Sequence, residues 1–275
     1  MDSGPGGFLV SVPMLSPISM RFDQARLKVE RANHHIKEMS VQIAAFTKVD
    51  FHSLRAGRDP NSGQYQLKLH TTASFPINAA LIIGDVAHNL SSALDYMATA
   101  VAGADDHRVD FPVEETRDRL EKSSSYRTIQ KARPDIASAI LNMIQPYEGG
   151  RHPVRAIRRL YNIDKHKLLI PHFQVTGLTG VSLESEGNDP ANRLVVTNLS
   201  MLIEDDLVLN AIGYPLPMKI TNKGHASFSV VFGKGGPFEG RSVIPTLVQL
   251  RNTVLYVIQV LEPVFFKRAD LKTAI

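Results

Sequence analysis

The chain has 275 residues, of which 43% are hydrophobic and 21% are charged. These proportions are ordinary for a globular protein, and they leave enough apolar residues for one large core or two smaller ones. The chain has no cysteine, which excludes disulfides, thiol nucleophiles and cysteine-ligated metals, and we expect a cytoplasmic protein. The formal net charge of +4 favours acidic partners.

The first predicted element is a long helix over residues 19–46. Residues 1–18 open with a run rich in glycine and proline, and we expect them to form a disordered leader. Apolar residues then recur in alternating steps of three and four, as on one side of an amphipathic helix that packs at a shallow angle on a neighbour. This seam consists of Phe22, Ala25, Val29, Ala32, Ile36, Met39, Ile43 and Phe46.

A strand and a second helix follow. Residues 64–71 alternate apolar and polar side chains, which predicts a strand that could join a larger sheet. The second helix begins after Pro76 and is closed by Gly103. Its apolar seam consists of Ile83, Val86, Leu90, Ala93, Met97 and Ala100. A polar stripe follows its other side, either facing water or lining a cavity, and consists of Asp85, His88, Ser92, Asp95 and Thr99.

The next part of the chain is expected to hold short helices and then a third, cationic helix. Residues 105–150 resemble short helices and loops, with the serines at 123–125 in a loop or cap. The third helix begins at Val154 and must end before Pro171. Only Asp164 opposes its cations, which are Arg151, Arg155, Arg158, Arg159, Lys165 and Lys167. This positive field either attracts an acidic partner or is a solvated face whose last residues complement the helix dipole.

Residues 172–241 change from a helical period to a period of two, which predicts strands. The expected strands are 172–183, 193–203, 207–212, 218–221 and 225–232, separated by turn compositions such as residues 222–224. Strands in this sequence predict an antiparallel meander. The following run, Gly233 to Pro237, lacks the Gly-Lys-Ser/Thr ending of a phosphate-binding loop, so we interpret it as a linker.

The last predicted element is an apolar helix from about Val243 to Val264. Two parallel apolar stripes indicate burial on two sides, as in the central helix of a bundle. Arg251 and Asn252 lie near its centre, and we therefore expect no membrane span.

Together these elements predict an α+β protein: a four-helix bundle core with an inserted antiparallel β-meander. Residues 19–171 and 242–275 would form the helical bundle, and residues 172–241 would form the inserted sheet, joined by the strand at 64–71.

The chemistry of the polar faces points to phosphodiester substrates. An imidazole can move a proton, a guanidinium can stabilise a phosphoryl charge, and a carboxylate can orient the imidazole. These are the parts of a metal-independent ribonuclease that needs no cofactor. The candidate catalytic residues are His166, Arg159, Asp164, His88, Asn89 and Asp95, with Asn162 as a further amide donor. The candidate phosphate-binding residues are Arg155, Arg158, Lys165 and Lys167. The alternative for His166 is a helix-end histidine satisfied by the dipole.

Two segments carry a resemblance. The second helix contains isoleucine-glycine-aspartate from Ile83, then His88-Asn89-Leu90 and Ala93-Leu94-Asp95, and the third contains Asn162-Ile163-Asp164-Lys165-His166. These segments resemble those of a group of uncharacterised bacterial proteins. The chain is more distantly similar to HEPN domains, helical bundles whose signature is an arginine separated from a histidine by four to six residues, as in Arg159 and His166, which have six residues between them. This resemblance implies RNA cleavage or RNA binding in bacterial stress or phage defence.

Two other classes of function stay open. Asp85, His88, Asp95 and His166 could assemble a mixed carboxylate and imidazole metal site for a hydrolase inside the bundle. The helices and strands could instead form a non-enzymatic protein-interaction module, with a homodimer formed through the second helix. For RNA, we expect phosphate contacts rather than base stacking, because few aromatic residues interleave with the cations.

Overall fold

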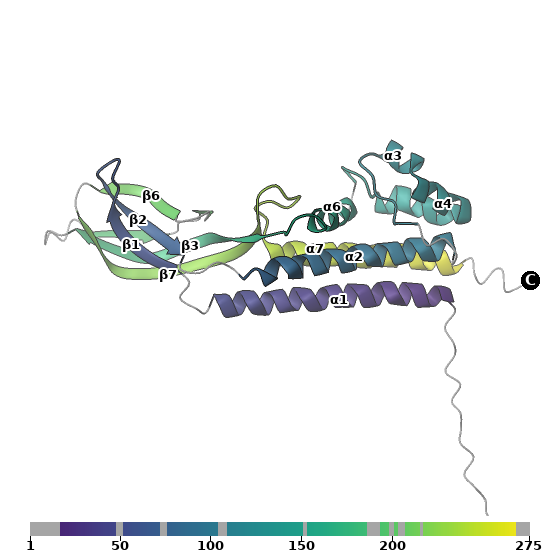
Figure 1. Ribbon diagram of the computed structural model, residues 1–275, viewed down its shortest axis with the longest axis horizontal. Coiled ribbons are helices and arrows are strands. Elements are labelled where there is room, and N and C mark those ends of the chain that lie inside the picture. Colours follow the sequence, from purple (N-terminus) through teal and green to yellow (C-terminus); the bar gives the residue numbers. More distant parts are fainter. Residues whose placement is uncertain are drawn as a thin grey trace, which may run out of the picture. The chain divides into compact units, whose positions relative to one another are not determined.

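The chain is a mixed α+β protein in the computed structural model (Figure 1). The described residues are 17–47, 52–71, 76–103, 109–150, 153–185, 193–197, 201–202, 207–214 and 217–267. Most of the expected leader therefore lies outside the described residues, and its last two positions begin the first helix.

Three long helices dominate the helical part: α1 (Pro17–Phe46), α2 (Asn78–Ala102) and α7 (Val243–Lys267) (Figure 1). The predicted apolar seam of α2 is buried throughout and includes Ile83, Val86 and Leu90. The seams of α1 and α7 are buried except near their C-terminal ends, where Ile43, Phe46 and Val264 are half-buried. The expected burial of α7 on two sides is wrong in part, because Leu255 on its second apolar stripe is exposed. The shorter helices are α3 (Arg117–Lys122), α4 (Ser124–Ala132), α5 (Pro134–Ala139), the π-helical turn η1 (Ile140–Ile144) and α6 (Val154–Asp164). These bounds confirm the predicted helices.

The chain divides into two compact units. The first combines α1 up to Lys28, α2 from Ser92, the short helices α3 to η1, and α7 from Leu255. The second combines the rest of α1, α2 up to Ser91, α6, the strands, and α7 up to Val254. Each long helix therefore contributes residues to both units.

In the first unit, the ends of α1 and α7 pack together. The ring of Phe22 lies 5.4 Å from that of Phe265 and 6.0 Å from that of Phe266. Arg26 forms an ion pair with Glu262. The helical seams predicted for α1 and α7 thus meet directly in this unit.

Arg133 joins the short helices to the end of α7. Its guanidinium donates to the carbonyl oxygens of Val264, at 2.8 Å, and Phe265, at 3.2 Å. It also makes two hydrogen bonds to the Asp135 carboxylate and lies 4.7 Å from the centre of the Phe265 ring. One side chain therefore satisfies a carboxylate and two carbonyls near a helix end.

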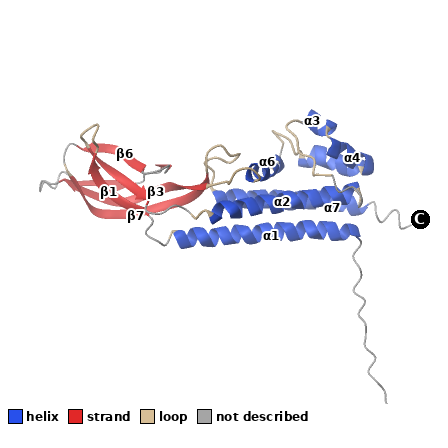
Figure 2. Ribbon diagram, in the orientation of Figure 1, coloured by secondary structure: helices blue, strands red, loops and turns tan. Residues whose placement is uncertain are grey.

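The second unit holds all the strands that the structure describes. They are β1 (His52–Arg58), β2 (Tyr65–Thr71), β3 (Pro171–Ser185), β4 (Arg193–Thr197), β5 (Met201–Leu202), β6 (Leu207–Tyr214) and β7 (Met218–Phe232). One sheet has the order β1-β2-β6; in the other, β3 pairs with β4, β5 and β7. All pairs are antiparallel. Figure 2 shows these strands in red.

The predicted meander is wrong in its strand order. The strand predicted at 64–71 pairs with β6, whereas β7 pairs with β3, far earlier in the chain. Because strand pairing depends on segments distant in sequence, local alternation identifies strands without assigning their neighbours.

The predicted turn at residues 222–224 is also wrong, because β7 runs through it without a break. Gly224 adopts φ +65°, and a Cβ there would lie 2.7 Å from the backbone nitrogen of Val181 on the paired strand. The glycine therefore accommodates an irregularity inside a long strand pair instead of ending it.

The helix α7 is the one described helix that is long and apolar enough to cross a membrane by length and composition. Half of its most apolar stretch is buried within the protein. Near the middle of the helix, Arg251 donates to the side-chain oxygen of Asn33 on α1. These contacts fit a core helix, which passes the same compositional test.

Candidate functional site

The helices α2 and α6 approach each other closely at Gly84, in the second unit. Gly84 is buried, and a Cβ built there would lie 2.5 Å from Oδ2 and 2.6 Å from Cγ of Asp164. Such distances are far inside van der Waals contact, so only a residue without a side chain permits this approach. The two sequence segments that carry the resemblance therefore meet in space.

Three ionisable side chains gather at this meeting point. Asp85 and His88 are exposed on α2, and Asp164, the last residue of α6, is half-buried. Burial raises the pKa of the Asp164 carboxyl above its ordinary value, the nearby Asp85 carboxylate raises it further, and His88 lowers it. The Asp164 carboxyl therefore holds a proton more readily than an exposed aspartic acid.

An aromatic side chain extends this group along α6. The His88 ring lies 5.4 Å from the ring of Tyr161, at an interplanar angle of 56°. The Lys165 ammonium lies on the face of the same tyrosine, with Nζ 4.1 Å from the ring centre. We call Asp85, His88, Tyr161, Asp164 and Lys165 the α2–α6 cluster.

The α2–α6 cluster combines an imidazole, a carboxyl and an ammonium group. Imidazoles as a class gain and lose a proton near neutral pH, and His88 is open to solvent. The neighbouring carboxyl of Asp164 can hold a second proton, and Lys165 provides a positive charge. The arrangement can therefore accept one proton, supply another and stabilise negative charge.

Of the predicted catalytic residues, the structure brings His88 and Asp164 together. Asn89, beside His88 in sequence, is 7% exposed, and its side-chain amide donates to the backbone oxygen of Asp85 at 2.8 Å. One amide hydrogen of Asn89 thus serves its own helix, which leaves little of this side chain for a substrate.

Asp95 belongs to the first unit and has a structural partner there. Its Oδ1 accepts a hydrogen bond from the backbone N–H of Phe111 at 2.9 Å, and Phe111 is buried. The Thr99 hydroxyl donates to the backbone oxygen of Asp95. Asp95 therefore fixes the segment that follows α2 within the first unit.

Arg159 and His166 are exposed, and within the described part of the chain neither side chain forms a hydrogen bond or an ion pair. Helical spacing places Arg159 on the outer side of α6, opposite the buried seam of Val154, Ile157 and Leu160. His166 follows the end of this helix. The predicted pair is therefore open to solvent, without a described partner to orient it.

The predicted phosphate-binding residues lie on or just beyond α6. Lys165 and Lys167 are exposed, and Arg155 and Arg158 are half-buried. Arg151, also counted in the cationic segment, lies outside the described residues. By helical spacing, Arg158 and Lys165 flank the tyrosine of the α2–α6 cluster, so the cationic face begins at the cluster.

Sequence reasoning missed two members of this site, Gly84 and Tyr161. Tyr161 was not among the predicted site residues, because its partner His88 lies on another helix. The signal for Gly84 was present, because a glycine inside an apolar helix costs stability and often marks a close contact.

The predicted metal site is not assembled. Among the described residues, no group of three or more His, Asp or Glu side chains is placed to hold a metal ion. The four predicted ligands fall in different places: Asp85 and His88 join the α2–α6 cluster, Asp95 bonds the Phe111 backbone, and His166 is exposed.

Comparison with protein-family models, with curated proteins and with solved structures finds no match to this chain. Its function is therefore inferred from the geometry of its own residues.

Proposed function

We propose that this protein binds RNA through the cationic face of α6 and cleaves it without a metal ion, using the α2–α6 cluster for proton transfer. The observation that carries the proposal is the position of His88, which is exposed beside a carboxyl whose pKa is raised, at the edge of a cationic helix. The active unit would be the helical core of the second unit, with α6 packed on the long helices as a four-helix bundle.

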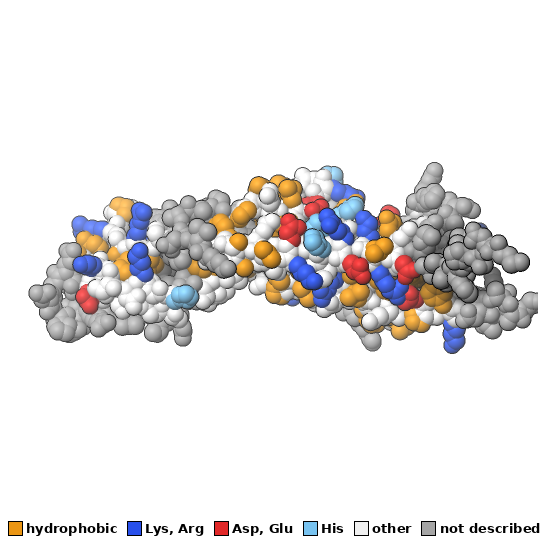
Figure 3. Space-filling view, turned by 90° about the horizontal axis from the view of Figure 1, so that it is seen from below, with side chains coloured by type: hydrophobic (Ala, Val, Ile, Leu, Met, Phe, Trp, Pro, Cys, Tyr) orange, Lys and Arg blue, Asp and Glu red, His pale blue; other side chains and the backbone are white. Residues whose placement is uncertain are grey.

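The charge distribution supports a polyanionic substrate at α6. From Val154 to Lys167, Asp164 is the single acidic residue, and burial and Asp85 favour its protonated form. The face of the molecule over α1 differs, because cations and acids are interspersed along it (Figure 3). The phosphate backbone of a nucleic acid binds most strongly to a surface whose charges are positive, without acidic groups between them. The favoured contact surface is therefore α6.

In the proposed reaction the 2′-oxygen of a ribose bonds to the adjacent phosphorus, and the bond from phosphorus to the 5′-oxygen breaks. His88 accepts the proton of the 2′-hydroxyl, and the Asp164 carboxyl, in the molecules in which it carries a proton, gives that proton to the leaving 5′-oxygen. Lys165 stabilises the negative charge that grows on the phosphoryl oxygens.

The roles of Arg159 and His166 differ in this proposal from those that the HEPN resemblance implies. Both are exposed, and no described side chain orients them. We therefore assign them phosphate contacts, together with Lys167, and place proton transfer at His88. A cytoplasmic location and a role in bacterial stress or phage defence stay predictions.

The test is cleavage of a mixed-sequence single-stranded RNA in the presence of EDTA. We expect cleavage to persist with EDTA, to be lost in His88→Ala, and to continue in His166→Ala with weaker RNA binding. His34→Ala, at an exposed histidine of α1, is the matched control. Cleavage that survives in His88→Ala, or that stops on chelation, would overturn the catalytic assignment; salt-dependent binding without cleavage would leave RNA binding alone.

A protein-interaction module is the second candidate, because several large apolar side chains of the second unit are half or more exposed. They are Val41, Ile77, Leu81 and Ile170. Ile77 directly precedes α2, and Leu81 lies in its first turn. If this surface forms a homodimer, Leu81→Glu converts the dimer to a monomer in light-scattering measurements, and RNA binding stays unchanged.

A further inference from the structure

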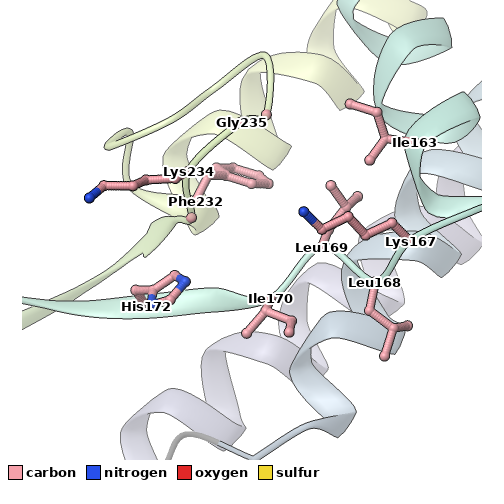
Figure 4. A pocket seen from close by; sticks show the side chains of 11 residues that line it. Ile163, Lys167, Leu168, Leu169, Ile170, His172, Phe232, Lys234 and Gly235 are labelled. Carbon is pink, nitrogen blue, oxygen red and sulfur yellow. The ribbon is translucent and has the colours of Figure 1, made fainter. Parts of the chain in front are cut away.

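We infer that a pocket in the second unit, separate from the α2–α6 cluster, binds a small organic anion with an apolar body. The pocket has a volume of about 200 Å³. Its walls come from the end of α6, the segment leading into β3, and the loop that follows β7 (Figure 4). These three parts of the chain are distant in sequence, and the fold brings them around one space.

The apolar part of the pocket is formed by Ile163, Ile170 and Phe232. In Figure 4, Ile163 on α6 and Phe232 at the end of β7 face the same space from two sides. Phe232 is buried, whereas Ile170 is half exposed at the rim. The pocket therefore offers an apolar interior with an open side, which suits a ligand that buries a hydrocarbon body.

The charged part of the pocket has one sign. Lys167, His172 and Lys234 belong to the lining, and none of the described residues that line the pocket is acidic. Figure 4 shows Lys167 extending across the pocket and His172 below it on β3, whereas Lys234 points away. A carboxylate or phosphate placed between Lys167 and His172 would meet a positive charge and a ring N–H donor.

The glycine loop after β7 is built against this lining. A Cβ at Gly233 would lie 2.6 Å from Cδ2 and 2.7 Å from Nε2 of His172, so the absence of a side chain lets the imidazole pack against the loop.

Hydrogen bonds within the loop hold this wall in place. The Phe232 N–H donates to Arg241 O, and the Gly240 N–H donates to Phe232 O, each at 3.0 Å. The Gly235 N–H donates to the Glu239 carboxylate at 3.0 Å. The wall is thus fixed before any ligand enters, which lowers the entropy cost of binding.

The volume sets the size of the ligand. At about 30 Å³ for each water-sized group, the pocket holds about seven such groups. A six-carbon chain with one carboxylate or one phosphate fills it. The sequence alone suggested a linker at residues 233–237, because the three walls meet only in the folded chain.

The test is isothermal titration calorimetry of the full chain with four probes that share a six-carbon body: hexanoate, hexyl phosphate, 1-hexanol and hexylammonium. We expect the anions to bind about tenfold more tightly than hexanol, because hydrogen bonds to charged groups add to apolar burial. Hexylammonium should not bind. The stronger of the two anions identifies the headgroup, and equal affinity for all four probes would overturn the inference.

Two variants and a control sharpen the measurement. Lys167→Gln should weaken hexanoate binding about tenfold and leave hexanol binding unchanged. Ile170→Glu places a carboxylate at the rim, where half of the Ile170 side chain is exposed, and should abolish anion binding without unfolding the chain. Lys223→Gln, at an exposed position of β7 outside the pocket, should bind as the parent chain does. Unchanged hexanoate affinity in both pocket variants would refute the site, whatever the outcome of the RNA experiments.

Discussion

The two halves of α2 carry the same polar stripe, and they use it differently. In the second unit, Asp85 and His88 are exposed and influence the pKa of Asp164, a carboxyl on another helix. In the first unit, Asp95 accepts a hydrogen bond from the Phe111 backbone N–H. One half of the stripe therefore meets an ionisable group, and the other half meets the backbone.

The difference shows what helical spacing can and cannot predict. Steps of three and four place the five polar residues of the stripe on one side of the helix. The partner of each residue comes from a segment distant in sequence, α6 in one case and the segment before α3 in the other. A carboxylate that accepts a hydrogen bond from a backbone N–H has a structural role. A carboxyl held close to an imidazole and a second carboxylate has a shifted pKa and can take part in proton transfer.

The sharpest test of this comparison is activity at His88. We expect His88→Ala to lower the rate of RNA cleavage by about 100-fold or more, the usual effect of losing a proton-transfer group. Because the side chain is exposed, the melting temperature should not change. Single-turnover cleavage measures the rate, and thermal unfolding measures the melting temperature. If Asp95→Ala lost as much activity per folded molecule as His88→Ala, the assignment of separate roles to the two halves of the stripe would be contradicted.

The next effect concerns the close approach that creates the site. Gly84→Ala puts a Cβ against the Asp164 carboxylate, and we expect it to lower the free energy of unfolding by about 2 kcal/mol through overpacking. Urea denaturation measures this loss. Gly57→Ala is the matched control, because a Cβ there meets nothing within 4 Å. A stable Gly84→Ala variant would mean that α6 does not rest on α2 as described.

We expect a smaller loss of stability for a substitution in the half of the stripe that belongs to the first unit. Asp95→Ala leaves the backbone N–H of the buried Phe111 without this acceptor, and we expect a loss of about 1–2 kcal/mol in urea denaturation. Asp118→Ala, which removes an exposed ion pair with Lys122, should cost less than about 0.5 kcal/mol. If Asp95→Ala lowered the free energy of unfolding no more than Asp118→Ala does, the structural role of Asp95 would be contradicted.

The smallest effect is a pH dependence at Asp164. Its pKa is raised in the folded chain, so its contribution to stability is full below the unfolded value of 3.8 and is lost as pH rises through the folded value. Asp164→Asn should therefore be more stable than the parent at pH 7, by less than about 1 kcal/mol because solvent screens the charge. The difference should vanish at acid pH. A constant difference across the pH range would contradict the raised pKa.

The long helices could be predicted from the sequence, because each one repeats an apolar seam over many turns and ends at glycine, proline or a polar run. The strand β1 was missed, since His52 to Arg58 has few apolar residues to alternate. The turn after it, from Asp59 to Gly63, was the available signal: Asp59 accepts hydrogen bonds from Asn61 and Ser62.

The candidate site could be predicted in part. His88 and Asp164 were singled out because they lie in two polar helical faces, and the structure joins them. The roles given to His166 and Arg159 relied on spacing within one helix, which fixes the side on which a residue lies and says nothing of its partner. Tyr161 entered the site because it contacts His88 across two helices, information that no single segment contains.

The contacts of Arg133 bear on how the last turn of α7 behaves. Helix ends ordinarily fray, because their final carbonyls have no partner within the helix. Here a guanidinium more than a hundred residues earlier in sequence holds two of those carbonyls and stacks on a nearby ring. Amide hydrogens around Phe265 should therefore exchange with solvent only when the short helices open as well, so that the C-terminal turn reports on the cooperative opening of its whole unit.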